Sequence, residues 1–252
     1  MSNLFWLTDV QMDRLRPFFP RSHGKPRVDD RRVLSGIIFI NRKGLRWCDA
    51  PREYGPPKTL YNRWKRWSDR GVFARMMEGL AAEGTEQKTI MIDATYLKAH
   101  RTASSLRVKK GGRGRLIGRT KGGLNTKLHA VTDATGRPIR FFMTAGEVSD
   151  YTGAAAMLSS LPASDWLIAD RGYDADWFRD ALKDKGIRAC IPGRKSRGKV
   201  VRYDKRRYKR RNRIEIMFGR LKDWRRVATR YDRCPKVFLS AIALAATVLF
   251  WL

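Results

Sequence analysis

Hydrophobic and polar positions follow two different periods along the chain. In the first part, apolar residues recur at helical spacing, which predicts helices over roughly Asp9 to Phe18, Asp29 to Arg42 and Thr59 to Gly71. From Lys88 onward the runs KTIMIDAT, NTKLHAVTDA and PIRFFMTAGE are strand-like, with a turn at Thr135 to Pro138 between the second and third. The change of period near residue 88 predicts a helical region followed by an α/β region.

Beyond the third strand, helical and strand-like patterns alternate. A helix near Tyr151 to Leu161, the run WLIAD, a helix from Asp174 to Lys185 and the run RACIP give the order β-β-β-α-β-α-β. With a last helix added, this order is typical of an RNase H-like fold, a mixed five-stranded sheet with flanking helices. We predict a helical domain over residues 1–88 and an α/β domain over residues 89–252.

The predicted last helix carries a polar stripe made of Tyr208, Arg211, Glu215 and Lys222. On a continuous helix these four positions fall within an arc of roughly 60°. Apolar residues from Ile214 to Leu221 form a second stripe that can pack against a core. Glu215 is then a candidate metal ligand, although Arg211 and Glu215 at i,i+4 also make an ordinary helix ion pair.

The third N-terminal helix is apolar on one side and basic around it. Its residues Leu60, Trp64 and Trp67 share one side, and a short helix is expected before it, near Asp49 to Tyr54. This arrangement is similar to the recognition helix of a helix-turn-helix. Three cations of this helix are therefore candidate DNA contacts. These candidates are Arg63, Lys65 and Arg66. A basic amphipathic helix in a dimer interface is the alternative.

The composition points to a folded protein with a polyanionic partner. The 54 Lys and Arg residues against 24 Asp and Glu residues give a net charge of +30, which favours nucleic acid as that partner. Hydrophobic residues make up 42% of the chain, enough for a core and too many for a disordered basic tail. The three scattered cysteines support neither a disulfide framework nor a zinc ribbon, so we expect the cell interior.

The chain ends in an uncharged apolar run from Val237 to Leu252, sixteen residues long. A bilayer span needs about 20 residues, so we predict a buried terminal helix and no membrane partner.

Two strongly basic segments interrupt the α/β pattern, at residues 98–127 and 193–213. Neither has the apolar content to pack by itself, so we interpret both as loops that phosphates order, with flexible solvated insertions as the alternative. The candidate DNA contacts in the first loop are Lys109, Lys110, Arg113, Arg115, Arg119 and Lys121.

Two aspartates follow buried strands: Asp93 comes after Ile90-Met91-Ile92, and Asp170 after the run WLIA. The first and fourth strands are neighbours in the predicted sheet, so both carboxylates point to one site, which Glu215 reaches from the last helix. Three acids gathered there repel one another unless a divalent cation separates them. The alternatives are a turn cap for Asp93 and an ion pair with Arg171 for Asp170.

An oxygen-liganded site of this kind suits Mg²⁺ or Mn²⁺, and two such ions suit phosphodiester chemistry. We therefore predict that Asp93, Asp170 and Glu215 are catalytic metal ligands, and that Tyr208, Arg211 and Lys222 hold a DNA strand beside them. Three further acids are assigned structural roles: Asp133 in a turn, Asp150 at a helix start and Asp174 at a helix N-cap.

These motifs resemble those of the DDE transposases of bacterial insertion sequences, specifically the insertion-sequence-five family with its Tyr-Arg-Glu-Lys signature. The stretch from Ile92 to Thr95 resembles the first acidic motif, Ala169 to Asp174 the second, and Tyr208 to Lys222 the third. Ile117 to Lys127 is similar to the glycine-rich linking segment, and Trp47 to Trp67 to the N-terminal module.

The resemblance implies a transposase that binds the terminal inverted repeats of its element, cleaves the ends and joins the 3′ hydroxyls to target DNA. It also implies a dimer or larger synaptic assembly, in a bacterial cytoplasm and at the nucleoid when bound to DNA. About forty residues separate Asp170 from Glu215, too few for the β-rich insertion of larger relatives, and Trp177 falls on a predicted helix. We therefore do not predict a hairpin intermediate.

Two other functions are compatible with the same residues. An RNase H-like nuclease would cleave nucleic acid without joining it, and a catalytically inactive derivative would bind DNA alone. The N-terminal helical module favours the transposase over a simple nuclease, and the complete acidic motifs speak against decay.

Overall fold

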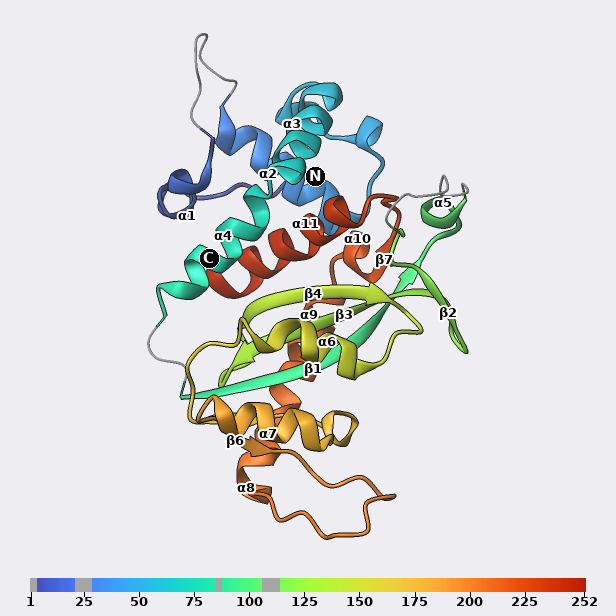
Figure 1. Ribbon diagram of the computed structural model, residues 1–252. Coiled ribbons are helices and arrows are strands. Elements are labelled where there is room, and N and C mark those ends of the chain that lie inside the picture. The colour runs from blue at the N-terminus through green and yellow to red at the C-terminus, as the bar shows by residue number, and fades with distance from the viewer. Residues whose placement is uncertain (1–3, 21–28, 85–87, 106–113) are drawn as a thin grey trace. The chain divides into compact units, whose positions relative to one another are not determined.

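The computed structural model describes residues 4–20, 29–84, 88–105 and 114–252 (Figure 1). Its contacts divide the chain into two compact units. Unit 1 contains Met1–Leu80, His100–Ser105 and Leu221–Leu252, and unit 2 contains Ala81–Ala99 and Leu106–Arg220. Unit 1 thus includes the C-terminal residues as well as the N-terminal helices, and the predicted domain division at residues 88 and 89 stays a prediction.

Unit 1 is built from helices. Its elements are α1 (Asp9–Leu15), α2 (Asp30–Lys43), α3 (Pro57–Asp69), most of α4 (Val72–Ala82), α5 (Arg101–Ser104), α10 (Arg225–Ala228), β7 (Thr229–Arg230) and α11 (Pro235–Ala246). Short 3₁₀ turns lie at Arg16–Phe18, Trp47–Asp49 and Arg52–Tyr54. The three predicted N-terminal helices are confirmed, and α4 is an additional one.

Local sequence signals explain where these helices begin and end. The Thr8 side chain accepts from the Gln11 backbone N–H, and the Gln11 side chain accepts from the Thr8 backbone N–H in return, which starts α1 with a capping box. Helix α2 ends at Gly44, whose φ of 73° lies in the left-handed region that glycine adopts without strain. These caps agree with the predicted helix ranges Asp9 to Phe18 and Asp29 to Arg42.

The apolar sides of the unit 1 helices are buried as predicted. On α3 the side chains of Leu60, Trp64 and Trp67 are at most 1% exposed. The C-terminal run forms α11 and a following π-helical turn over Thr247–Trp251, and its residues are largely buried. None of the described helices combines the length and apolar character that a bilayer crossing requires.

Unit 2 is built around a mixed sheet. Its strands are β1 (Thr89–Ala99), β2 (Gly118–Thr120), β3 (Gly123–Asp133), β4 (Pro138–Ala145), β5 (Trp166–Ile168) and β6 (Arg188–Cys190). The order is β2-β3-β1-β5-β6, with β4 paired to β3. The β1–β3 and β3–β4 pairs are antiparallel, and β1–β5 and β5–β6 are parallel. All five predicted strands are confirmed, and β2 was not predicted because it lies in the Gly-rich basic segment.

Helices α6 (Asp150–Leu158) and α7 (Asp176–Asp184) pack against the sheet (Figure 1). The core beneath them includes Ile90 and Ile92 of β1, Leu167 of β5 and Phe178 of α7. Successive side chains of a strand point to opposite faces. Asp93, which follows Ile92, therefore points to the face away from this core.

The predicted continuous last helix is in fact three consecutive helical segments. They are α8 (Lys205–Tyr208), a 3₁₀ turn (Lys209–Arg211) and α9 (Asn212–Lys222). The predicted apolar side of α9 is confirmed, because Ile214, Met217, Phe218 and Leu221 are buried. The polar stripe therefore follows a helical path, although not a single α-helix.

Candidate active site on the sheet of unit 2

The register of the parallel pair β1–β5 brings Asp93 and Asp170 together. Thr89 pairs with Trp166 and Met91 with Ile168. Continued for two more residues, the same offset places Asp170 directly beside Asp93. Ile92 and Ala169, the residues just before them, both belong to the core of the opposite face. The predicted adjacency of the two acids therefore rests on strand pairing, with both side chains directed away from the core.

Backbone amides hold one oxygen of each aspartate. The Ala94 N–H donates to Asp93 Oδ1 at 2.8 Å, and the Gly172 N–H donates to Asp170 Oδ1 at 2.8 Å. Asp170 thereby caps the 3₁₀ turn Arg171–Tyr173. A Cβ on Gly172 would lie 2.7 Å from Asp170 Oδ1, so the glycine allows this close approach. Both carboxylates are thus oriented by the chain that follows them.

Burial makes Asp93 an unusual carboxyl group. Its side chain is 14% exposed, and desolvation is the main reason that its pKa rises to about 6. The negative charges of Asp170 and Glu215 raise this pKa further, while the Ala94 N–H and Arg211 lower it. Asp170 and Glu215 therefore both lie close enough for their charges to act on Asp93.

Arg211 connects two of these acids directly. Its Nη1 donates to Asp93 Oδ2 at 2.7 Å, and its Nη2 donates to Glu215 Oε1. The Glu215 side chain is 54% exposed and lies one helical turn after the arginine. The i,i+4 pair that was the alternative interpretation of the stripe is therefore present, and it extends to Asp93.

Tyr208 lies on the same side of the helical path. The Arg211 guanidinium is 6.0 Å from the centre of the Tyr208 ring. Burial raises the pKa of Tyr208, and the charge of Asp170 adds to that effect. Lys222 is the last residue of α9 and belongs to unit 1, where burial lowers its pKa. Tyr208 and Arg211 therefore lie near the acids. That these two residues and Lys222 hold a DNA strand together stays a prediction.

The donor chemistry of this site fits a hard divalent cation, because every candidate ligand atom is a carboxylate oxygen. Within the described residues, however, no group of three or more His, Cys, Asp or Glu side chains is arranged to hold a metal ion. The cation found between Asp93 and Glu215 is the Arg211 guanidinium. An ion bound by all three acids would therefore require Arg211 to release at least one of them.

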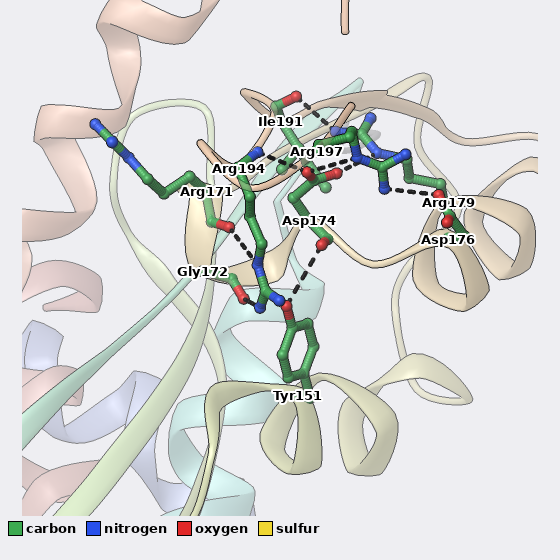
Figure 2. A network of polar contacts seen from close by, with 9 residues as sticks. All are labelled: Tyr151, Arg171, Gly172, Asp174, Asp176, Arg179, Ile191, Arg194 and Arg197. Atoms are coloured by element: carbon green, nitrogen blue, oxygen red, sulfur yellow. Dashed lines mark hydrogen bonds and ion pairs between the residues drawn. The ribbon is translucent and has the colours of Figure 1, made fainter. Parts of the chain in front are cut away.

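Asp174 is the centre of a buried network and is not a helix N-cap, contrary to the sequence prediction (Figure 2). The N-cap of α7 is Ala175. The fully buried Asp174 carboxylate accepts from Arg179 Nε at 2.8 Å, from Arg197 Nε at 2.9 Å and from the Arg194 backbone N–H at 2.7 Å. Burial works against its ionisation, but these hydrogen bonds outweigh burial and lower the pKa of Asp174.

The same network fastens the second basic segment beside Asp170. The Arg194 guanidinium donates to the carbonyls of Arg171 and Gly172, and it lies 4.5 Å from the centre of the Tyr151 ring (Figure 2). Contacts with Asp174 and with the carbonyls of Arg171 and Gly172 therefore hold the start of the segment 193–213. The sequence did not predict this network, because its partners are up to 23 residues apart.

Asp133 and Asp150, the other two acids that the sequence assigned to structural roles, also make structural contacts. Asp133 accepts hydrogen bonds from the backbone N–H groups of Thr135 and Arg137 in the turn between β3 and β4. Asp150 begins α6 and pairs with Lys127 Nζ at 3.0 Å.

The three candidate DNA contacts of α3 differ in their surroundings. Arg63 is 9% exposed, pairs with Asp30 at 2.5 Å and lies over the Trp67 ring. Lys65 pairs with Asp69 at 2.6 Å, and Arg66 is exposed. The expectation that Arg63 is available on the surface is therefore wrong, because its partner lies 33 residues earlier in the chain.

The candidates of the first basic segment are described in part. Lys109, Lys110 and Arg113 lie outside the described residues. Arg119 and Lys121 are exposed in the β2–β3 hairpin, and Arg115 is half-buried. Their contacts with DNA stay predictions.

Sequence comparison finds two family models that together match most of the chain. Residues 84–250 match the family described as "Transposase DDE domain". Residues 7–77 match "Putative transposase of IS4/5 family (DUF4096)". The first match contains all three candidate acids.

Individual relatives agree with these families. The chain is 38% identical over 130 residues to the "Putative transposase for insertion sequence element IS6501" of Brucella ovis, covering 51% of this chain and 99% of that one. It is 28% identical over 137 residues to the "Putative transposase for insertion sequence element IS402" of Burkholderia cepacia, covering 50% and 63%.

A solved structure shares the fold. The piggyBac transposase in a synaptic complex with hairpin DNA superposes with a TM-score of 0.53 at 9% identity, covering 97% of this chain and 72% of that one. At this identity the likeness concerns the fold, which agrees with the RNase H-like class predicted from the sequence.

Proposed function

The chain belongs to the DDE transposase family, and we propose that Asp93, Asp170 and Glu215 are the acids with which this DNA transposase cuts and joins DNA. The observation that carries the assignment is the pairing of β1 with β5, which sets Asp93 beside Asp170, together with the Arg211 bridge that connects Asp93 to Glu215.

A divalent cation, Mg²⁺ or Mn²⁺ and preferably two, would be held by the three carboxylates. When bound, such ions activate the attacking oxygen and stabilise the leaving one in phosphodiester displacement. The chain itself supplies the orientation, because the Ala94 and Gly172 N–H groups hold one oxygen of Asp93 and of Asp170. The other oxygen of Asp93 accepts from Arg211. Arg211, which contacts both Asp93 and Glu215, would be available for a DNA phosphate if it released these carboxylates.

The proposed substrates are the terminal inverted repeats of an insertion sequence and a target duplex. The net charge of +30 supports a DNA partner, and exposed Arg66, Arg119 and Lys121 are available for phosphate contacts. We further propose a dimer or larger assembly at the paired ends, in the bacterial cytoplasm and at the nucleoid when DNA is bound.

The assignment is tested by neutralising each acid without changing its shape. Asp93→Asn, Asp170→Asn and Glu215→Gln are each expected to lower Mg²⁺-dependent cleavage of element ends by about a thousandfold or more, equivalent to about 4 kcal/mol of transition-state stabilisation. Gel-shift affinity for the ends in EDTA should be retained or increased, since each change removes negative charge.

Asp180→Asn is the matched control, because Asp180 is an exposed aspartate of α7. It is expected to cleave like the unchanged protein. Metal-dependent cleavage that survives in any of the three variants would remove that residue from the site.

A further inference from the structure

A second basic site lies at the other end of the strands that carry the candidate acids. An open cavity of about 920 Å³ begins where β1 and β5 begin, at Thr89 and Trp166. Five cations and two acids take part in its lining, so its charge is strongly positive. The cations are Lys88, Arg137, Arg188, Arg207 and Arg210, and the acids are Asp133 and Asp165.

Trp166 arranges two of these cations. The guanidinium carbons of Arg188 and Arg207 lie 4.2 and 4.3 Å from the centre of its ring system. Arg188 lies on β6, and Arg207 contacts Thr89 of β1. These strands flank β5 on its two sides, so the two guanidinium groups approach the Trp166 ring from opposite sides. Stacking in this way restrains both side chains. Arg188 is exposed, whereas the half-buried Arg207 also donates to Thr89 Oγ1 at 3.4 Å and pairs with Asp204 at 3.5 Å.

This arrangement selects a class of ligand. Planar guanidinium groups bind phosphate oxygens through paired N–H donors, so the restrained Arg188 and Arg207 suit phosphates. Because both faces of Trp166 are covered, a nucleic-acid base cannot stack on it. The cavity is therefore suited to a phosphate backbone and not to an inserted base.

The cavity and the candidate acids are connected through two elements. Along β1, Thr89 at the cavity precedes Asp93 by four residues, or roughly 13 Å at the usual strand rise. The helical path from Lys205 to Arg211 supplies Arg207 and Arg210 to the cavity, and Tyr208 and Arg211 to the acids. A single DNA strand is long enough to contact both places.

We propose that this cavity binds backbone phosphates of the DNA that is cut at Asp93 and Asp170, a few nucleotides away from the scissile phosphate. The inference rests on the proposed function for its choice of DNA, but the binding itself needs no metal and no cleavage. Arg188, Arg207 and Arg210 are the contacts, and Trp166 is a positioning residue.

The test compares two double variants that remove the same charge. Arg188→Gln with Arg210→Gln alters two exposed cations of the cavity, and Lys183→Gln with Lys185→Gln alters two exposed cations outside its lining. Affinity of the full-length protein for a duplex carrying the junction between insertion sequence and flank is measured in EDTA over a range of salt concentrations.

Each lost phosphate contact reduces the slope of log affinity against log salt by about 0.9, so the cavity variant should lose a slope of about 2. The control variant should keep nearly the full slope. An equal loss of slope in both variants, or an unchanged slope in the cavity variant, overturns the proposal. An unchanged slope would exclude DNA phosphates as the ligand of the cavity and make an acidic protein the remaining candidate.

The outcome is separable from that of the proposed function. A protein that shows the slope difference but cuts no DNA would support the cavity and contradict the catalytic assignment. Cleavage that depends on Asp93, without a slope difference between the variants, would support the catalytic assignment and contradict the cavity proposal.

Discussion

Arg211 is the residue on which the state of the candidate site depends. It contacts Asp93 and Glu215 together, and so it neutralises charge that a divalent ion would otherwise neutralise. A cation in this place reduces the repulsion between the Asp93 and Glu215 carboxylates. We infer that metal and guanidinium compete for the same carboxylates.

This competition predicts that Arg211→Gln binds metal more tightly in the absence of DNA. A gain of roughly tenfold in Mn²⁺ affinity is expected, equivalent to about 1.4 kcal/mol. Electron paramagnetic resonance of free Mn²⁺ during titration measures it directly. Arg213→Gln is the control, because Arg213 is an exposed cation two residues along the same path. An affinity of Arg211→Gln equal to that of the control, or lower, would show that Arg211 does not compete.

At the scale of elements, the 3₁₀ turn Arg171–Tyr173 and the basic segment that starts near Gly193 are held together by Asp174. The buried carboxylate has charged partners on α7 and in the segment, Arg179 and Arg197. Removing one member of a buried ionic network leaves the others desolvated and unpaired, which costs about 3–5 kcal/mol. The segment should therefore loosen when Asp174 is neutralised.

Asp174→Asn is accordingly expected to lower the free energy of unfolding by about 3 kcal/mol or more. It should also speed tryptic cleavage after Arg194 and Arg197. Asp176→Asn provides the comparison, because Asp176 also pairs with Arg197 but its side chain is 77% exposed, and such pairs contribute about 1 kcal/mol or less. Urea unfolding and timed proteolysis measure both effects. Similar behaviour of the two variants would mean that Asp174 does not anchor the segment.

The elements also show how far the sequence could predict the structure. The strands of unit 2 were predictable because each combines an apolar run with a flanking turn signal, and the adjacency of Asp93 and Asp170 followed from strand order. Helical periodicity predicts on which side of the helix axis the side chains of Tyr208 and Arg211 lie. It does not distinguish one α-helix from helical segments that are joined by a 3₁₀ turn.

Side chains with distant partners were not predictable. Arg63 and Asp174 depend on residues far away in the chain, Asp30 and Arg197, and a local pattern contains no information about such pairs. The cavity around Trp166 was missed for the same reason, since its cations come from four separate segments.

At the scale of the whole molecule, the excess of positive charge and the candidate acids have complementary uses. A net charge of +30 attracts DNA over long distances, and the three candidate carboxylates of unit 2 are the groups that we propose to hold the metal. This combination separates a transposase from an inactive DNA-binding derivative. It does not separate joining from plain cleavage, which depends on the fate of the 3′ hydroxyl.

The most direct test of the account is therefore strand transfer with pre-cut element ends and Mg²⁺. The protein is expected to join ends that carry a 3′ hydroxyl to a target duplex, and to leave ends with a 3′-dideoxy terminus unjoined. The joined product should be absent with Asp170→Asn. Shorter fragments without any joined product would contradict the account and identify the protein as a nuclease.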